Sequence, residues 1–346
     1  MKPTFRAAEV TRSGTLEIVE RPTPMPGQGE VLIAVEACGI CGADAGDIDR
    51  ADPEAQPRRI PGHEVVGQIA AIGDGVPSIW RTGQRVGVGR LGGHCNECDQ
   101  CLRGEFQLCR NQPFVGSSCD GGYAEMMIAK ATGLVSIPAE LSSEEAAPLL
   151  CAGIATFNAL KKCGAEAGDT VAIHGIGGLG HLALQYARKM GFRVVAVGRG
   201  PDIGGDAMEL GAHIYIDANN EDVAARLQQI GGARSIITTI GDAKAVSALV
   251  AGLSPHGRLV LLGAGKDPLA IPAGVLVIGE RDILGSITGT PFENERTLDF
   301  SVLADVRARI EIVPLELANE AVAKMRSGRA DFRMVLTMKG SHDAHQ

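Results

Sequence analysis

Hydrophobic and polar positions form two different patterns along the chain. Up to about residue 140, apolar runs of four or five residues stand between Gly and Pro turn signals, and helical periodicity is weak. Three such runs lie at 31–35, 65–69 and 85–88. This pattern predicts a β-rich or irregular unit.

The pattern changes near residue 142. Ser142 and Glu145 have the spacing of a helix capping box, and the apolar helical stretch that follows reaches Leu160 with an interruption at Pro148. After Asp169, strand-like and helix-like segments alternate, which predicts a parallel, doubly wound sheet. The predicted strands are 170–174, 193–197, 213–217, 235–239 and 258–262, and the predicted helices are 178–190, 202–210, 222–230 and 243–253.

The chain length suggests two domains. A domain usually has about 100–200 residues, so a chain of 346 residues is long enough for two domains. We expect an α/β protein with a β-rich domain over 1–150 and a doubly wound domain over 151–280. Beyond residue 281 the pattern is mixed again, and we expect 281–346 to return to the first domain.

Composition excludes several classes of protein. Hydrophobic residues make up 45% of the chain and charged residues 21%, as in globular proteins. The net charge of −8 argues against a nucleic-acid partner, which calls for clustered Lys and Arg. Because there is no apolar run of about 18 residues and no apolar N-terminal segment, we expect no membrane span, no secretory signal and a cytoplasmic location.

Four of the nine cysteines fall in one polar loop. These are Cys95, Cys98, Cys101 and Cys109. Four thiolates satisfy a tetrahedral Zn²⁺, and because such a site is closed we assign it a structural role. An iron–sulfur cluster is the alternative, since ligand softness alone does not distinguish the two.

Three further residues are candidate ligands of a second metal. Cys41, His63 and Cys151 would make the two-Cys, one-His set of a catalytic zinc with an open fourth position. Spacing alone does not bring together residues so far apart in the chain. Structural roles for each of them therefore stay open on this evidence.

A glycine-rich motif lies between the first predicted strand and helix of the doubly wound region. Its residues are Gly175, Ile176, Gly177, Gly178, Leu179 and Gly180. In this context G-x-G-x-x-G predicts dinucleotide binding, with the pyrophosphate at the helix N-terminus. Gly175 would allow the tight turn, Gly177 the approach of the pyrophosphate, and Gly180 close packing of helix and strand.

The end of the second predicted strand bears on the choice of cofactor. NAD-binding sites carry an acidic residue there for the ribose hydroxyls, whereas this chain has Gly198 and Arg199. The planar Arg199 side chain could pair with a 2′-phosphate, which favours NADP(H). NAD(H) stays open, because Asp202 could serve it from a shifted loop.

Together these motifs resemble the zinc-containing medium-chain alcohol dehydrogenase family, in particular bacterial members. The resemblance runs from Gly29-Glu30-Val31-Leu32 to Phe332-Arg333-Met334-Val335-Leu336. It also includes Cys38-Gly39-Ile40-Cys41, Gly62-His63-Glu64, Asp120-Gly121-Gly122-Tyr123-Ala124-Glu125, Leu150-Cys151-Ala152-Gly153 and Gly177-Gly178-Leu179-Gly180-His181. It implies a GroES-like catalytic domain, a Rossmann domain and an active site in the cleft. It further implies a zinc-dependent alcohol dehydrogenase or aldehyde reductase that acts on small alcohols or carbonyls and forms a homotetramer or homodimer.

The resemblance also implies roles for single residues. Cys41, His63 and Cys151 would bind the catalytic zinc, Glu64 would lie behind the metal as a transient ligand, and Asp44 would orient His63. Residues near the nicotinamide would be Thr156, Gly263, Ala264, Ser286, Ile287 and Thr288.

Two positions depart from the family pattern. Ala43 stands where members usually carry the Ser or Thr of a proton relay. Three interpretations follow: water replaces the hydroxyl, the enzyme is a slow or unusual alcohol oxidiser, or it reduces an activated C=C bond. Arg90 stands where an aromatic residue often lines the pocket, so it either attracts an anionic substrate or pairs with an acidic neighbour or solvent.

A nucleotide-binding redox sensor without turnover is the alternative from another class of protein. The presence of Cys41, His63, Glu64 and Cys151 together argues against it.

Overall fold

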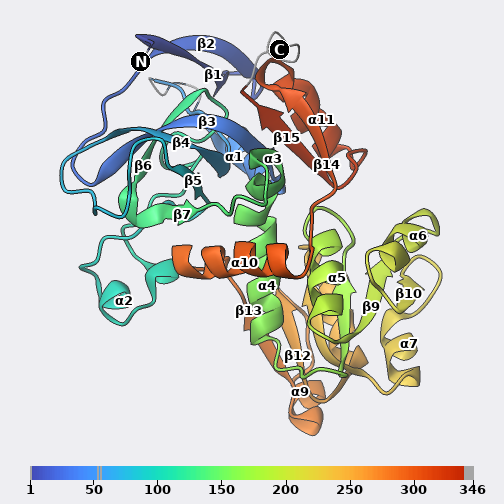
Figure 1. The fold of residues 1–346 in the computed structure, drawn as a ribbon. Coiled ribbons are helices and arrows are strands. Elements are labelled where there is room, and N and C mark those ends of the chain that lie inside the picture. Colours follow the sequence, from blue (N-terminus) through green and yellow to red (C-terminus); the bar gives the residue numbers. More distant parts are fainter. Residues whose placement is uncertain (1, 53, 55–56, 339–346) are drawn as a thin grey trace. The chain divides into compact units, whose positions relative to one another are not determined.

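The computed structural model describes residues 2–338 apart from 53, 55 and 56. The chain divides into two compact units (Figure 1). Unit 1 is Met1–Ile154 with Thr288–Gln346, and unit 2 is Ala155–Ile287. Within the described residues, no helix is both long and apolar enough to span a membrane.

Unit 1 is built on antiparallel sheets (Figure 1). Its strands are β1 (Thr4–Val10), β2 (Leu16–Pro22), β3 (Glu30–Ile40), β4 (Glu64–Ile72), β5 (Arg85–Val88), β6 (Met126–Lys130), β7 (Leu134–Ser136), β14 (Ile310–Pro314) and β15 (Arg333–Thr337). Strands β1 and β2 pair with each other, and the larger sheet has the order β14-β15-β3-β4-β5-β7, with β6 also on β3. Among the described residues of this sheet, only the β14–β15 pairing is parallel. Strand β3 is central because β15, β4 and β6 all pair with it.

Short helices complete unit 1. They are α1 (Gly42–Arg50), α2 (Asp99–Leu102), α3 (Ser143–Ala146), α10 (Pro291–Leu303) and α11 (Ala318–Arg326), with 3₁₀ turns η1 (Phe106–Leu108), η2 (Ala131–Gly133), η3 (Ala147–Leu150) and η5 (Leu315–Leu317). The predicted capping box before α3 is confirmed, because Ser142 Oγ accepts from the Glu145 N–H and Glu145 accepts from the Ser142 N–H. Helix α1 was not predicted, because its Gly, Ala and Asp residues form no apolar stripe.

Unit 2 contains the predicted doubly wound sheet. Its strands are β8 (Thr170–His174), β9 (Arg193–Gly198), β10 (Ile214–Asp217), β11 (Ala233–Thr238), β12 (Leu253–Leu261) and β13 (Asp282–Gly285). All of them are parallel, in the order β10-β9-β8-β11-β12-β13. Renumbered from one, this is the strand order 3-2-1-4-5-6 of dinucleotide-binding folds, whose ligands bind outside the carboxyl ends of β8 and β11.

The helices of unit 2 connect these strands. They are α5 (Gly180–Lys189), α6 (Asp202–Glu209), α7 (Val223–Gln229), α8 (Ala243–Leu249) and α9 (Ala273–Gly279), while α4 (Ala152–Lys162) crosses the division between the units, and the turn η4 is Val250–Gly252. The largest errors in the predicted boundaries of this unit lie at one junction, where the strand expected over 258–262 begins at Leu253 instead. The helix expected over 243–253 ends at Leu249, because Leu253 already begins β12, where it pairs with Ala233.

Candidate functional site

Sheet pairing brings the first candidate ligands together. Cys41 directly follows β3 and His63 directly precedes β4, and these two strands pair so that Gly39 faces Glu64. Cys151 ends the turn η3 with a non-helical backbone (φ −129°, ψ −70°). Its Sγ lies 4.0 Å from Cys41 Sγ, and the ligand atoms of Cys41, His63, Glu64 and Cys151 all lie within 4.8 Å of one another. All four residues are buried.

A buried carboxylate orients His63. Asp44 Oδ1 lies 2.7 Å from His63 Nδ1, while Asp44 Oδ2 accepts hydrogen bonds from the Cys41 backbone N–H at 2.8 Å and the Tyr123 hydroxyl at 3.0 Å. Burial lowers the pKa of His63, but the Asp44 carboxylate outweighs it and raises the pKa overall. Burial also raises the pKa of the Tyr123 phenol, so that it stays a donor at neutral pH.

A second buried carboxylate lies beside the ligands. Both Glu64 oxygens accept from Arg333 Nη2, and neither side chain is more than 3% exposed. Burial raises the pKa of Glu64, and the Arg333 guanidinium opposes this rise. Gly39 makes room for the pair, because a Cβ at that position would lie 2.0 Å from Glu64 Oε2. Sequence reasoning missed Arg333, although its segment carries part of the resemblance.

These residues fit a zinc ion. His63 Nε2 is buried and has no hydrogen-bond partner among the described residues, which is costly unless a metal or another group occupies it. The contact with the Cys151 thiol and the nearby His63 imidazole lower the pKa of Cys41, which favours the thiolate that metals bind. Two sulfurs and one imidazole leave a tetrahedral ion one open position.

The four-cysteine loop is a second candidate metal centre in unit 1. Neighbouring sulfurs lie at 3.6 Å (Cys98–Cys101 and Cys95–Cys109), 3.9 Å (Cys95–Cys101) and 4.0 Å (Cys98–Cys109). A tetrahedron with Zn–S bonds of about 2.3 Å has edges of about 3.8 Å, which these distances bracket.

Backbone amides favour thiolates in this loop. The Glu97 N–H is the main cause that lowers the pKa of Cys95 to about 6, and the Arg110 N–H lowers the pKa of Cys98. The Asn111 backbone N–H and the Cys95 backbone N–H both donate to Cys109 Sγ at 3.4 Å. The loop therefore supplies charge stabilisation as well as sulfur ligands.

The glycine-rich loop joins β8 to α5 in unit 2. Gly175 has φ +91°, and a Cβ there would lie 2.6 Å from Thr239 Oγ1. A Cβ on Gly180 would lie 2.0 Å from the Gly175 carbonyl oxygen, whereas one on Gly177 would meet nothing within 4 Å. The loop thus turns tightly, packs closely at Gly180 and leaves space at Gly177, which fits a bound pyrophosphate.

Arg199 follows β9 at the carboxyl edge of the same sheet. Its side chain is exposed and makes no hydrogen bond or ion pair with any residue that the structure describes. The nearby Asp217 carboxylate accepts a hydrogen bond from the Gly200 backbone N–H at 2.8 Å and not from Arg199. Burial lowers the pKa of His174, at the end of β8, to about 4, so this residue is neutral at pH 7.

The remaining residues predicted near the nicotinamide are divided between the units. Thr156 is buried on α4 in unit 2, Gly263 and Ala264 follow β12, and Ser286 and Ile287 follow β13. Thr288 is the first residue of the segment that belongs to unit 1.

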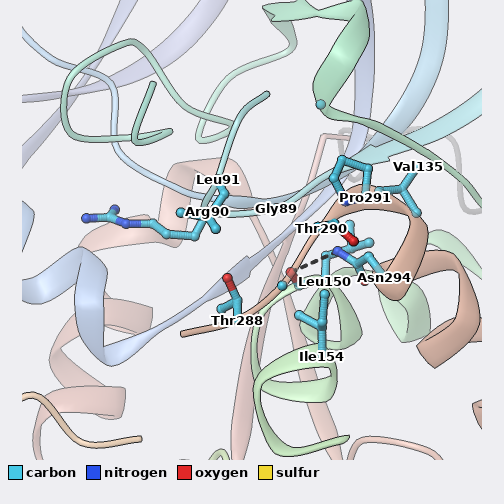
Figure 2. Close-up of a pocket in the computed structure, with 12 residues that line it drawn as sticks. Gly89, Arg90, Leu91, Val135, Leu150, Ile154, Thr288, Thr290, Pro291 and Asn294 are labelled. Carbon is cyan, nitrogen blue, oxygen red and sulfur yellow. Dashed lines mark hydrogen bonds between the residues drawn. The ribbon is translucent and has the colours of Figure 1, made fainter. Parts of the chain in front are cut away.

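A small pocket in unit 1 lies next to the Cys151 turn (Figure 2). Its lining includes Leu91, Leu150 and Thr288. Asn294, 4% exposed, donates from Nδ2 to the Leu150 carbonyl at 3.3 Å and was not predicted from the sequence. Figure 2 shows the Arg90 side chain pointing away from Leu150 and Asn294.

Arg90 is paired within the protein. Its guanidinium donates to both carboxylate oxygens of Asp47, which is buried on α1, and to the Val115 carbonyl at 3.1 Å. Of the two interpretations of Arg90, the structure therefore favours the acidic neighbour over an anionic substrate.

Comparison with known proteins places these features in a family context. Residues 27–139 match the family described as alcohol dehydrogenase GroES-like domain, and residues 178–303 match the family described as zinc-binding dehydrogenase. An alcohol dehydrogenase from Geobacillus stearothermophilus is 41% identical over 327 residues, which cover 94% of this chain and 96% of the relative. Alcohol dehydrogenase notN from Aspergillus sp. (strain MF297-2) is 39% identical, with 93% of this chain and 94% of the relative covered.

Solved structures share the whole fold. A cinnamyl alcohol dehydrogenase (SbCAD4) from Sorghum bicolor (L.) Moench superposes with a TM-score of 0.88 at 29% identity, covering 98% of this chain and 99% of that one. The acetophenone reductase from Geotrichum candidum NBRC 4597, solved in complex with NAD, gives 0.85 at 26% identity, with 97% and 98% covered.

Two substitutions in the glycine-rich loop test whether Gly180 is required for packing and Gly177 is not. Gly180→Ala should lower the free energy of unfolding by about 1–3 kcal/mol, because its Cβ would collide with the Gly175 carbonyl oxygen. Gly177→Ala is the matched control and should leave stability nearly unchanged. Urea denaturation measures both, and equal losses would show that the loop is not packed as described.

Proposed function

Because the chain belongs to the zinc-containing medium-chain alcohol dehydrogenase family, we propose that its GroES-like unit binds two zinc ions with different roles. The chain is an enzyme that interconverts alcohols and carbonyl compounds with a nicotinamide cofactor. The catalytic ion is held by Cys41, His63 and Cys151, with Glu64 as a transient ligand. The structural ion is held by Cys95, Cys98, Cys101 and Cys109. The substrate is a small alcohol or aldehyde.

One observation carries the catalytic assignment. His63 Nε2 is a buried ring nitrogen with no hydrogen-bond partner among the described residues, and two cysteine side chains lie beside it. A packing role for His63 would leave this nitrogen unsatisfied, whereas a metal uses its lone pair directly.

The chain's residues prepare this centre for chemistry. When bound, zinc supplies a Lewis acid that polarises the substrate oxygen, and the nicotinamide gives or takes a hydride. Asp44 holds the proton on His63 Nδ1 and so leaves Nε2 free as a ligand. Arg333 balances the charge of Glu64 in a site where an unpaired carboxylate would be costly.

Proton release takes a different route from that of most relatives. Ala43 has no hydroxyl, but it is exposed on α1, so solvent can reach its position. Water therefore takes the part of the missing relay group in this proposal. Reduction of an activated C=C bond is the second candidate, because that reaction needs no proton on the carbonyl oxygen.

Cofactor preference is proposed from Arg199. The guanidinium is exposed and has no partner in the part of the chain that the structure describes, so it suits a 2′-phosphate, which it can bind in bidentate fashion. NADP(H) is therefore the preferred cofactor, while Asp202, in the first turn of α6, is the residue that would serve NAD(H).

Assembly and location are also proposed. Strand β13 lies at the end of the parallel sheet, and Val277 and Ile278 on α9 are 75% and 89% exposed. An open strand edge with exposed apolar residues suits a homo-oligomer, a dimer or tetramer. None of the nine cysteines, all of which the structure describes, forms a disulfide, which suits a reducing compartment such as the cytoplasm.

Metal content tests the two sites separately. The wild-type protein should contain about two zinc ions per chain, because it has one closed and one open ligand set. Cys151→Ser should lose one ion and turnover but keep cofactor binding, whereas Cys98→Ser should lose the other ion and thermal stability. Elemental analysis with a fluorescence titration of NADPH measures these changes. One ion in the wild type, or turnover in Cys151→Ser, would refute the catalytic assignment.

Ala43→Ser tests the relay. A serine hydroxyl at this exposed position should raise alcohol oxidation by about tenfold if proton transfer limits the rate. Gly42→Ala is the neighbouring control and should have no such effect, since its Cβ meets nothing within 4 Å. Steady-state rates with alcohols, aldehydes and enals measure this. If both Ala43→Ser and Gly42→Ala reduce the C=C bond of enals faster than they reduce aldehydes, the result would favour the C=C reductase.

Arg199→Ala tests cofactor choice. Loss of a charged hydrogen bond of about 1.5–3 kcal/mol should weaken NADPH binding by about 10- to 150-fold and leave NADH binding nearly unchanged. Asp202→Asn is the reciprocal control, which should affect NADH only. Fluorescence titration measures the dissociation constants of NADPH and NADH for each variant. A wild-type protein that binds NADH alone would contradict the proposal.

A further inference from the structure

The Tyr123 backbone is held against the segment that leads into His63. The Tyr123 N–H donates to the Pro61 carbonyl at 3.0 Å, and the Gly122 N–H donates to the Gly62 carbonyl at 3.0 Å. On the other side, the Ala8 N–H donates to the Tyr123 carbonyl at 2.8 Å. Tyr123 therefore cannot shift without moving the segment of Pro61 and Gly62, which positions His63.

The space for the Tyr123 ring depends on a glycine. Gly62 has φ +97°, and a Cβ there would lie 2.3 Å from the ring. The ring is fully buried, and its hydroxyl reaches Asp44 Oδ2 at 3.0 Å. A ring confined in this way presents its hydroxyl to one acceptor in a single orientation.

The hydroxyl completes the hydrogen bonding of a fully buried carboxylate. Asp44 Oδ1 faces His63 Nδ1, while Oδ2 has two donors, the Cys41 backbone N–H and the Tyr123 hydroxyl. Two donors on Oδ2 fix the orientation of the carboxylate, so that Oδ1 stays directed at His63 Nδ1. A fixed Oδ1 in turn orients the imidazole ring and so directs Nε2 toward the metal site.

We propose that Tyr123 is a positioning residue that retains the catalytic metal by acting through Asp44 on His63. The inference rests on the proposed function, because it presumes that His63 binds a metal. With phenylalanine at position 123, Oδ2 would keep only the Cys41 N–H. The carboxylate would then be held in place by one contact fewer, and it would orient the His63 ring less firmly.

Tyr123→Phe in the zinc-loaded enzyme tests this, with metal release to an excess of a chromophoric chelator as the readout. The wild type should release zinc in two phases, one for each site. Tyr123→Phe should speed the catalytic phase by about tenfold and leave the four-cysteine phase unchanged, so that the latter serves as an internal control. Tyr186→Phe, a buried tyrosine in unit 2, is the matched control and should change neither phase.

A double-mutant cycle shows whether the hydroxyl acts through the carboxylate. Asp44→Asn should also speed the catalytic phase, and adding Tyr123→Phe to it should cause little further change, because the two groups share one path to His63. Additive effects, or a catalytic phase that Tyr123→Phe leaves unchanged, would overturn the inference.

Two further results separate the possible failures. Acceleration of both phases together with a lowered unfolding midpoint would mean general loosening and would also overturn the inference. A wild-type protein with a single release phase and one zinc ion would instead refute the proposed function.

Discussion

The pairing of β3 with β4 and β15 is the constraint on which the proposed catalytic centre depends. In this register Gly39 faces Glu64 on one side and Val335 on the other. The pairing places Cys41, His63 and Arg333 at the same end of the sheet, although they are widely separated in the chain. A slip of one residue in either ladder would turn Glu64 or Arg333 to the opposite face.

The two cysteine sites depend on the chain in different ways. The four-cysteine loop spans fifteen residues, so short turns bring its sulfurs together and backbone amides stabilise them locally. The catalytic set depends on long-range pairing, on the break at Cys151 and on a buried carboxylate. Local spacing therefore predicted the first site from the residues alone, whereas the second needed a family resemblance.

The same distinction separates what could be predicted of the fold from what could not. The doubly wound unit has local strand–helix periods, and the strand at 170–174 was predicted from them. In unit 1, the capping box at Ser142 was predicted from the local spacing of Ser142 and Glu145. Helix α1 lacks an apolar stripe, so its sequence carries no such signal. Tyr123 and Arg333 meet their carboxylate partners 79 and 269 positions away. Contacts between residues so far apart in the sequence become visible only in the folded structure.

Gly39 has a consequence for how this sequence can vary. A Cβ at position 39 would overlap the Glu64 carboxylate, so any side chain there requires a different residue at position 64 as well. A shorter residue at 64 would leave Arg333 as a buried charge without its partner. The three positions are therefore coupled in one direction: a side chain at 39 requires a smaller residue at 64, and a smaller residue at 64 leaves Arg333 unpaired. A side chain at position 39 is therefore expected only in a sequence that has also replaced Glu64 and Arg333.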